Sequence, residues 1–452
     1  MSLPARIETV IVGAGHAGLT MSWYLREAGR EHVLVERRSI LGGAWHDRWD
    51  AFRLVSPNWT ASFPSDPYRG DDPDGFMPRT EIAARVAGYA ATIDAPVHLE
   101  TAVERLRTRP GGGFRLETTS GTIDAERVVV AAGSFHVPRL PTIAADLPAR
   151  LTQLHSHRYR SESALPPGGV LVVGSGQSGV QIAEELMDAG RAVHLSVGTA
   201  GRVPRRYRGH DIFRWLHGLG TRGDAVGVAL PTVDKLPDPR MRLMGNPHLS
   251  GHGGGHDTNL RQFAGAGMTL IGRIERVTGQ RLWLAGDLAT NLARADTFFD
   301  ERFRDLCDRF IERSGFEATA DERVPFEYEP PEIRELDLAA AGISSVIWTT
   351  GYRLDFGWLD LPILDEQGIP RQQEGVSDVP GLFFLGLLWQ RNQLSATLMG
   401  PAVDARRLAG AMGLPEIDPE RLEMTPAPTH GDQPRSAPSI SSSSGSSRTS
   451  SA

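Results

Sequence analysis

The chain has 452 residues, enough for two or three domains that together bury about three quarters of the unfolded surface. Its formal net charge of −7, from 48 basic and 55 acidic residues, argues against a dedicated nucleic-acid binder. One cysteine, Cys307, excludes a disulfide-stapled scaffold and an enzyme with a redox cysteine pair. No apolar run reaches the roughly 20 residues of a membrane span, and no signal peptide is apparent, so we expect a cytoplasmic protein without integral membrane contact.

The chain opens with a strand, a glycine-rich turn and a helix. Residues 7–12 are apolar and β-branched, as in a buried parallel strand. They lead into the first fingerprint, Gly13-Ala14-Gly15-His16-Ala17-Gly18, and a helical pattern that stops at Gly29. Gly13 allows the tight turn, Gly15 leaves room for a pyrophosphate, and Gly18 lets the helix approach the strand. This pattern predicts a dinucleotide-binding unit.

The next strand, residues 32–35, ends on Glu36. A carboxylate at this place accepts hydrogen bonds from ribose hydroxyls and repels a 2′-phosphate. The first fingerprint therefore predicts a site for FAD or NAD, and not for NADP.

A similar unit recurs later in the chain. Residues 170–173 form an apolar strand before the second fingerprint, Gly174-Ser175-Gly176-Gln177-Ser178-Gly179, and a helical pattern stops at Gly190. The following strand ends on Ser196 with no acid beside it. Four arginines follow, whose guanidinium groups match phosphate geometry: Arg202, Arg205, Arg206 and Arg208. We expect NADP rather than NAD here, bound through Arg202 and Arg205; the alternative is that these arginines are solvated surface charges.

The other segments complete an α/β pattern. We expect helices near residues 80–93 and 296–314, strands at 114–118 and 128–133, a hinge at 166–169, and long functional loops over 198–257. Two further apolar segments, 346–351 and 382–386, end in glycine. The Ser/Pro-rich tail from about residue 425 is expected to be disordered.

Three histidines stand four residues apart between His248 and His256. On a helix this spacing would align metal ligands, but four glycines within the run disfavour a helix. We expect no metal, and instead a mobile lid that becomes ordered when NADPH or substrate binds.

Several further motifs resemble those of the flavin-containing monooxygenases, single-component flavoproteins that use FAD and NADPH (class B). The bacterial flavoproteins labelled as involved in potassium transport and the plant indole-pyruvate monooxygenases look most similar. The two fingerprints carry the resemblance, over roughly residues 7–412. It is strengthened by Gly42-Gly43-Ala44-Trp45, by the strand-ending Gly133 and Gly351, and by Gly386 in a G-L-F-F-L-G element.

The resemblance implies that NADPH reduces the flavin and that a flavin C4a-hydroperoxide then oxygenates a small substrate with molecular oxygen. Catalytic candidates are Asn58, His155 and Gln393, although a turn role for Asn58 and a structural role for His155 stay open. The implied cofactor contacts are Gly13, Gly15, His16, Ala17, Gly18, Glu36, Arg37, Gly43, Trp45, Val103, Gly133, Gly174, Ser175, Gly176, Gln177, Ser178, Gly179, Arg202, Arg205, Gly351 and Gly386.

One departure keeps other functions open. The family signature F-x-G-x-x-x-H-x-x-x-Y/F retains His155 and Tyr159, but Ala149 and Leu151 replace the phenylalanine and glycine. The alternatives are a flavin oxidoreductase that uses NAD(P)H without inserting oxygen and a non-catalytic flavoprotein that senses NADPH for transport. The expected partners are a small molecule and oxygen, with no nucleic acid; a homodimer stays open.

The fold class expected is α/β with two Rossmann-like domains, the NADPH domain inserted into a discontinuous FAD domain. We expect boundaries at 1–165 and 336–415 for the two parts of the FAD domain, 166–335 for the NADPH domain, and 425–452 for the tail.

Overall fold

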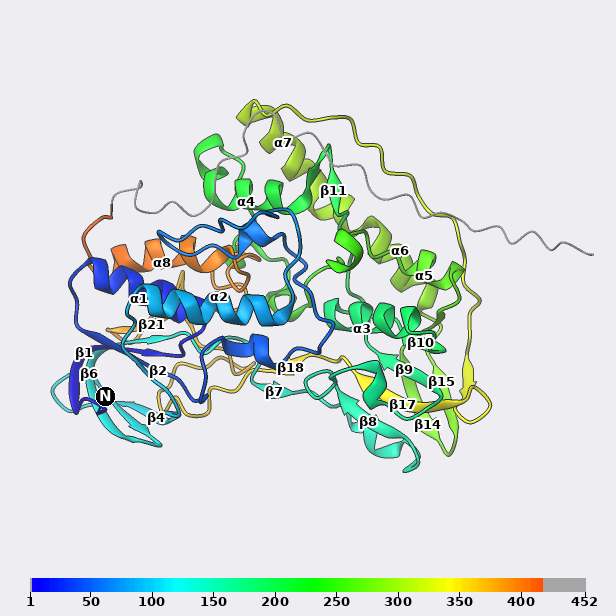
Figure 1. The fold of residues 1–452 in the computed structure, drawn as a ribbon, viewed down its shortest axis with the longest axis horizontal. Coiled ribbons are helices and arrows are strands. Elements are labelled where there is room, and N and C mark those ends of the chain that lie inside the picture. Colours follow the sequence, from blue (N-terminus) through cyan, green and yellow to red (C-terminus); the bar gives the residue numbers. More distant parts are fainter. Residues whose placement is uncertain (1, 418–452) are drawn as a thin grey trace, which may run out of the picture.

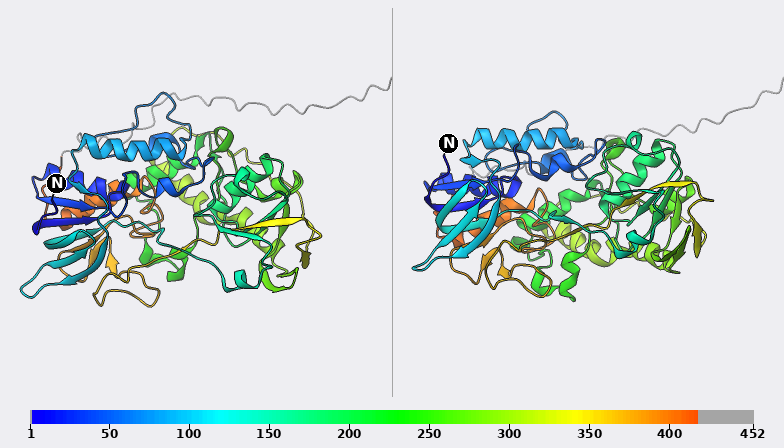
Figure 2. Two further views of the ribbon diagram at one scale, coloured as in Figure 1. Left: turned by 60° about the horizontal axis from the view of Figure 1, so that its bottom comes forward. Right: turned by 90° about the horizontal axis from the view of Figure 1, so that it is seen from below.

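The computed structural model describes residues 2–417, which form two α/β lobes side by side (Figures 1 and 2). The first lobe holds a nine-stranded sheet in the order β19-β20-β21-β6-β1-β2-β3, and β5 joins β4 to β6. Its strands are β1 (Arg6–Val12), β2 (His32–Val35), β3 (Val97–His98), β4 (Val103–Thr108), β5 (Phe114–Thr118), β6 (Gly121–Val130), β19 (Gln372–Gln373), β20 (Val376–Ser377) and β21 (Leu382–Phe384).

The second lobe holds a five-stranded parallel sheet in the order β13-β10-β9-β17-β8. These strands are β8 (Thr152–His155), β9 (Gly169–Val173), β10 (Val193–Ser196), β13 (Thr269–Ile271) and β17 (Ile343–Trp348). A smaller antiparallel sheet lies beside it: β14 (Ile274–Thr278), β15 (Arg281–Leu284) and β16 (Glu335–Asp337). Two short pairs complete the strands: β7 (Val137–Pro138) with β18 (Tyr352–Arg353), and β11 (Arg206–Tyr207) with β12 (His210–Asp211).

Helices cover the sheets and bridge the lobes (Figure 1). The first lobe carries α1 (His16–Glu27), α2 (Arg79–Thr92) and α8 (Gly400–Ala411); the second carries α3 (Gln177–Asp188), α5 (Leu260–Gly265) and α6 (Leu288–Phe299). Above both lobes lie α4 (Ile212–Arg222) and α7 (Asp305–Ser314). The π-helical turn η9 (Asp300–Arg304) joins α7 to α6. Short 3-10 turns are η1 (Gly43–Asp47), η2 (Asn58–Thr60), η3 (Thr142–Asp146), η4 (Glu162–Ala164), η5 (Asp224–Val226), η6 (Val233–Lys235), η7 (Pro239–Leu243) and η8 (His252–Gly254).

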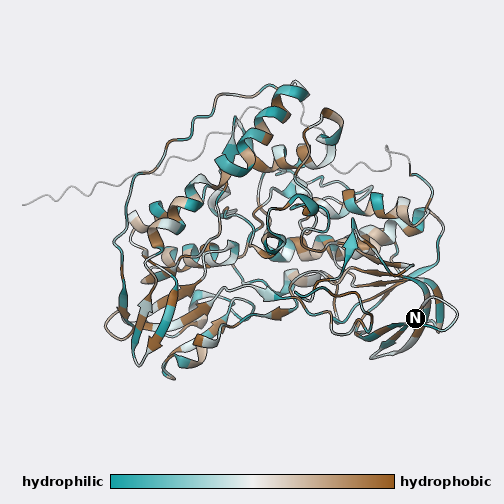
Figure 3. Ribbon diagram, turned by 180° about the vertical axis from the view of Figure 1, so that it is seen from behind, coloured by the Kyte–Doolittle hydropathy of each residue, from teal (hydrophilic) through white to brown (hydrophobic). Residues whose placement is uncertain are grey.

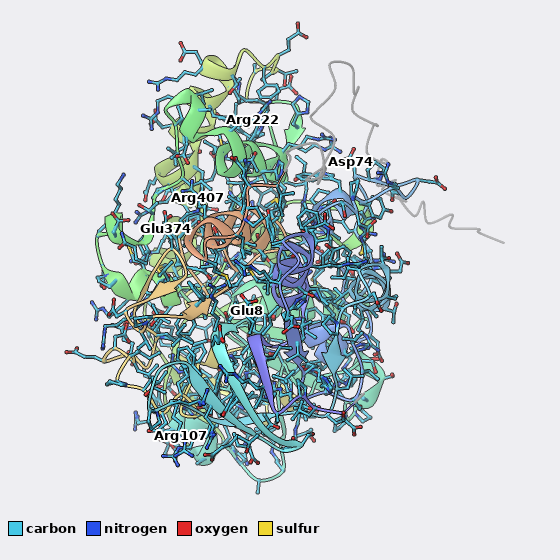
Figure 4. The ribbon with its side chains drawn as sticks, turned by 90° about the vertical axis from the view of Figure 1, so that its left-hand side faces the viewer. Glu8, Asp74, Arg107, Arg222, Glu374 and Arg407 are labelled. Atoms are coloured by element: carbon cyan, nitrogen blue, oxygen red, sulfur yellow. The ribbon has the colours of Figure 1, made fainter. Side chains whose placement is uncertain are left out.

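Apolar strands form the core of each lobe. Residues 128–130 and 170–172 are fully buried, and hydrophobic colour is concentrated on the central strands of both sheets (Figure 3). Strands buried on both faces read as continuous apolar runs, which is why the sequence revealed them. At the surface, Arg407 of α8 pairs with Asp224 of η5 at 3.0 Å and with Glu374 at 3.6 Å, and so ties the first lobe to the bridging helices (Figure 4).

The predicted fold class is confirmed, and two expectations about its parts need correction. The boundaries at 166 and 335 are too narrow, because β8 and β17 lie outside them yet pair in the second sheet. Helix α4 lies in a stretch that we expected to be loop. The predicted helices appear as α2 and as the α6–η9–α7 run, and the predicted tail lies outside the described residues. Within residues 2–417, no helix has the length and apolar character needed to cross a membrane.

Candidate functional site

The first fingerprint forms a tight turn, in which close backbone contacts leave no room for side chains at the first and last glycines. Gly13 has a φ of +104°, and a Cβ atom there would lie 2.6 Å from the carbonyl oxygen of Ala131, just after β6. A Cβ atom on Gly18 would lie 1.9 Å from the carbonyl oxygen of Gly13. A Cβ atom on Gly15 would have no atom within 4 Å, so the turn is open at this point. That open point, beside the N-terminus of α1, suits a pyrophosphate.

Glu36 closes one side of the same turn. Its Oε2 atom accepts a hydrogen bond from the Ala14 backbone N–H and its Oε1 atom accepts one from the Arg38 N–H, both at 3.0 Å. The side chain is buried at the end of β2. A carboxylate has about four acceptor positions, so the two that remain can accept ribose hydroxyls. Arg37, the next residue, is exposed.

Segments distant in sequence converge on the open point. A Cβ atom on Gly43 would lie 3.6 Å from the Gly15 Cα, and one on Gly386 would lie 3.0 Å from the Ala17 Cβ. The His16 ring contacts the Phe63 ring at 4.4 Å between centroids. Burial lowers the pKa of His16 to about 4, so the ring is neutral at pH 7. Glycines at 43 and 386 thus keep the rim of this site narrow.

The remaining predicted residues of the first site lie around it. Trp45 packs against Phe52 with ring centroids 6.0 Å apart, and Gly133 has a φ of +76° soon after β6. Val103 begins β4 opposite Thr118, two residues after Thr101, whose N–H donates to the Glu36 carbonyl at 2.8 Å.

The second fingerprint repeats the geometry of the first. Gly174 has a φ of +109°, and a Cβ atom there would lie 2.9 Å from the carbonyl oxygen of Thr349, just after β17. A Cβ atom on Gly179 would lie 2.0 Å from the Gly174 carbonyl oxygen, whereas one on Gly176 would have no atom within 4 Å. The Thr349 hydroxyl lies within hydrogen-bond distance of the carbonyl oxygens of Val173 and Gly174. Again only the middle glycine is open.

The strand register shows what replaces Glu36 in the second unit. Val35 lies opposite Val12 in the first sheet, and Ser196 lies opposite Val173 in the second. The counterpart of Glu36 is therefore Val197, which is 1% exposed. In the second unit the fingerprint itself supplies the acceptor, because the Ser175 hydroxyl accepts a hydrogen bond from the Gly198 N–H at 2.9 Å.

The two predicted phosphate arginines differ. Arg202 is partly buried and its Nε donates to Asp296 at 3.0 Å. Arg205 is 4% exposed, and its guanidinium donates to Asp211 at 3.0 Å and to the carbonyl oxygens of Val55 and Ser250 at 2.8 and 2.9 Å. The prediction for Arg205 is wrong, since burial and these three partners make it a structural link between lobes.

The Gly/His-rich loop, residues 248–257, lies against the start of α3. The Gln177 side chain donates to the Leu249 carbonyl oxygen, and its Oε1 atom accepts from the Leu249 N–H at 3.0 Å. The three histidines do not converge: His248 is fully buried, whereas His252 faces Asp188 and His256 faces Glu184. Among residues 2–417 no cluster of side chains suited to a metal is found.

The two retained signature residues tie elements together. His155 donates from Nε2 to the Gly351 carbonyl oxygen at 3.0 Å, and its Nδ1 accepts from the His157 N–H at 3.1 Å. Burial lowers the pKa of His155, which favours this neutral tautomer. Tyr159 is fully buried and donates to Glu185 of α3 at 2.9 Å. Both contacts support the structural alternative and hold β8 to β17 and α3.

Comparisons with known proteins agree with this architecture. The family model described as pyridine nucleotide-disulphide oxidoreductase matches residues 10–210. An "uncharacterized oxidoreductase CzcO-like" from Geobacillus kaustophilus is 30% identical over 406 residues, 89% of this chain and 97% of that protein. The probable indole-3-pyruvate monooxygenase YUCCA4 of Arabidopsis thaliana is 28% identical over 242 residues, 53% of this chain and 57% of its own.

The solved flavin-containing monooxygenase from Stenotrophomonas maltophilia shares the fold with a TM-score of 0.60 at 20% identity, over 91% of this chain and 99% of its own. The chain belongs to the flavin-monooxygenase-like family of flavoprotein oxidoreductases. The predicted resemblance is confirmed, and the family implies a flavin cofactor. The first site of this flavoprotein fits FAD, because the open Gly15, the buried Glu36 carboxylate and the glycine rim supply what its pyrophosphate and ribose need.

Two predicted catalytic residues of the flavoprotein have different surroundings. Asn58 is 5% exposed; its amide donates to the Asp72 carbonyl oxygen at 2.9 Å, and its Oδ1 accepts from the Met77 N–H at 2.6 Å. These contacts correct the catalytic prediction in favour of the turn role, since both ends of the amide hold the 72–77 loop. Gln393 is half-buried and lies seven residues before the start of α8.

Sequence reasoning missed a cluster where the bridging helices meet the first lobe. Trp59 contacts His217 of α4 at 5.4 Å between centroids, and its buried indole N–H has no hydrogen-bond partner in the structure. Leu394 and Met399 belong to the same buried cluster. The apolar spacing of Ile212, Trp215 and Leu219 was the available signal, but glycines on either side obscured it.

Proposed function

We propose that the chain is an FAD-dependent monooxygenase that uses NADPH and acts on a small organic substrate. The observation that carries the proposal is the contrast between two turns of matched geometry: one has Glu36 beside it and the other has Val197 in the same register position. A carboxylate suits FAD and excludes a 2′-phosphate, whereas the second site lacks that exclusion. Arg202 and its neighbouring backbone are the candidates for the 2′-phosphate.

In this proposal the protein residues bind, orient and exclude water. Bound flavin supplies hydride acceptance and oxygen activation. Gly15 and Gly176 present helix N-termini to two pyrophosphates, and His155 holds the strand end at Gly351 in place. Trp45 packs against one buried apolar cluster and Trp59 belongs to another, beneath α4; in this proposal both help to exclude water from the bound flavin. We place the protein in the cytoplasm.

Disulfide reduction is the activity that the matched family model names, and it does not suit this chain. Cys307 is the single cysteine and is fully buried. Burial raises the pKa of its thiol to about 12, so it is protonated and unreactive at pH 7. A second candidate, a flavin oxidoreductase without oxygen insertion, is favoured by Ala149 and Leu151 in place of the signature residues.

Turnover with labelled oxygen separates these functions. FAD-loaded protein is supplied with NADPH and ¹⁸O₂, together with panels of amines, thioethers and 2-oxo acids. The proposal predicts a product that carries one ¹⁸O for each NADPH consumed. Hydrogen peroxide equal to the NADPH consumed, with every panel, supports the oxidoreductase instead. Bound flavin that neither NADPH nor NADH reduces contradicts both enzymes and leaves the non-catalytic flavoprotein.

A further inference from the structure

The Gly/His-rich loop touches both lobes at once. A Cβ atom on Gly251 would lie 1.9 Å from the carbonyl oxygen of Leu54, and one on Gly255 would lie 2.3 Å from the Phe76 ring. Both contacted residues belong to the first lobe, whereas Gln177, which binds Leu249, begins α3 of the second lobe. Glycine is required at 251 and 255 because the loop is pressed against the opposite lobe.

Within the loop, His256 faces a hydrogen-bond acceptor at each ring nitrogen. Its Nε2 lies 2.6 Å from Oε1 of Glu184, and its Nδ1 lies 2.9 Å from the carbonyl oxygen of Asp257. Neither a carboxylate nor a carbonyl can donate, so both ring nitrogens must carry protons for both hydrogen bonds to form. Both hydrogen bonds are therefore satisfied when His256 is an imidazolium. The hydrogen bond to Glu184, opposed by burial, raises the pKa of His256.

Glu184 is the anchor on the second lobe. Its side chain is 8% exposed, and its Oε2 atom accepts from the Ser250 hydroxyl at 2.7 Å while Oε1 faces His256. A nearly buried carboxylate that lost its cationic partner would carry an uncompensated charge. The backbones of Ser250 and His256 also exchange two hydrogen bonds, at 3.2 and 3.1 Å, so the ion pair and the loop hairpin stabilise each other.

The other charged groups around His256 have hydrogen-bond or ion-pair partners of their own. Arg205, from the segment before β11, donates to the Ser250 carbonyl oxygen and pairs with Asp211. The Asp257 carboxylate accepts from the Arg205 backbone N–H. On the outer side His252 pairs with Asp188 at 3.3 Å, and both side chains are about half exposed. From the first lobe, Arg53 donates to the Phe76 carbonyl oxygen. The proton on His256 therefore decides whether the Glu184 carboxylate has a cationic partner.

We propose that His256, Glu184 and Ser250 form a proton-dependent clasp that holds the Gly/His-rich loop on Gln177 and so controls access of the nicotinamide nucleotide to the second fingerprint. The access role rests on the proposed function. When His256 loses its proton, one ring nitrogen presents a lone pair to an acceptor, and that hydrogen bond becomes a repulsion. The loop then leaves α3 more readily, and the backbone of Leu249 releases Gln177.

The raised pKa of His256 determines whether loop closure is favoured at low or at high pH. A histidine that gains an acidic partner on closure binds its proton more tightly in the closed state, so the closed state is fully favoured below the free value of 6.5. The advantage is lost as the pH rises through the higher value of the closed state. Glu185, one residue along α3, titrates in an overlapping range, because burial raises its pKa to about 7, and therefore it needs its own control.

Hydrogen–deuterium exchange of the full-length, FAD-loaded chain tests the clasp. After correction for intrinsic rates, protection of residues 249–257 should fall about tenfold from about pH 6 to pH 9 in the wild type. His256→Gln should be poorly protected at every pH, and His256→Lys, which keeps the cation, should stay protected at pH 9. The matched control His252→Gln and the variant Glu185→Gln should both follow the wild type.

The clasp is refuted by wild-type protection that does not change with pH, or by His252→Gln or Glu185→Gln abolishing the change. Stopped-flow mixing with NADPH then tests the access role: association should speed up with pH in the wild type and stay slow in His256→Lys. Association that is independent of pH in both overturns that role. If NADPH binds to neither protein although the exchange result holds, the proposed function fails and the clasp stands.

Discussion

The two fingerprints share one backbone design, and the proposed function assigns a different nucleotide to each. In both, the first glycine is pressed against the end of a third strand, at Ala131 in one lobe and Thr349 in the other, and the middle glycine alone is open. Both first glycines also donate to the strand beside them, Gly13 to Val35 and Gly174 to Ser196. The shared features are steric, so they select a pyrophosphate and no particular nucleotide.

The difference lies in one register position. In the first unit the Glu36 side chain reaches back to the Ala14 N–H of the fingerprint. In the second unit Val197 occupies that position and the Ser175 hydroxyl of the fingerprint reaches out to the Gly198 N–H. In the second unit the acceptor is therefore a fingerprint hydroxyl rather than a carboxylate on the neighbouring strand, and the buried negative charge of Glu36 has no counterpart. In the proposed function, residues beside the glycine turn rather than within it therefore determine which nucleotide binds.

The largest expected effects come from filling the two open points. Both Gly15 and Gly176 have negative φ values, and nothing lies within 4 Å of a Cβ, so alanine fits the protein and obstructs only a ligand. Gly15→Ala should weaken FAD binding about 100-fold or more. Gly176→Ala should keep FAD and lose NADPH affinity to a similar degree.

Each variant is the control of the other, with far-UV circular dichroism to verify folding. FAD retention on desalting and NADPH titration measure the two affinities. Loss of FAD from Gly176→Ala, or normal FAD in Gly15→Ala, would show that the sites are assigned wrongly.

Glu36→Gln is expected to be next in size. The amide keeps the shape but loses the charge that two backbone N–H groups face, and hydrogen bonds to charged groups contribute about 1.5–3 kcal/mol, or roughly 10- to 100-fold in FAD affinity. Isothermal titration of the apoprotein with FAD measures the effect. Unchanged affinity would remove Glu36 from the site.

The two predicted arginines should separate binding from stability. Arg205→Ala should lower the free energy of unfolding by about 3 kcal/mol in urea, because it breaks a buried ion pair. Arg202→Ala should raise KM for NADPH about tenfold with little change for NADH, since only NADPH carries the 2′-phosphate. Arg206→Ala, exposed in β11, serves as the control for both. Equal changes in both KM values would reject the role of Arg202.

Gly198→Asp places a carboxylate where the second unit lacks one. Nothing lies within 4 Å of a Cβ at this position, so the side chain fits. Like-charge repulsion should shift the ratio of kcat/KM from NADPH toward NADH about tenfold or less in a solvated site. A ratio that does not change would mean that the 2′-phosphate binds elsewhere.

The smallest effect concerns the contact between Tyr159 and Glu185 of α3, within the second lobe. Glu185 binds a proton more tightly when folded, its pKa being raised from 4.5 to about 7 by burial, so stability should decline as the pH rises between those values. Glu185→Gln should flatten this decline, and thermal unfolding across pH 5–8 checks it. Tyr159→Phe is the matched variant, which removes the hydrogen bond but not the carboxylate.

Local steric patterns were predictable and long-range partners were not. The glycine turns and Glu36 follow from backbone geometry within a few dozen residues of sequence. Arg205 could not be assigned, because its partner Val55 is 150 residues away in the chain. Asn58 likewise resembled a ligand-binding residue until its contacts with Asp72 and Met77 were known. The predicted domain boundary at 335 had to move beyond β17, because β17 pairs with β9, which no local pattern specifies.

Anaerobic mixing of the FAD-loaded protein with NADPH tests most directly the claim that the two fingerprints hold two different nucleotides. The account predicts that the flavin absorbance bleaches with one NADPH per FAD, and that Gly176→Ala, still carrying FAD, bleaches far more slowly at the same NADPH concentration. Wild-type protein whose bound flavin stays oxidised, or Gly176→Ala that bleaches at the wild-type rate, would contradict it.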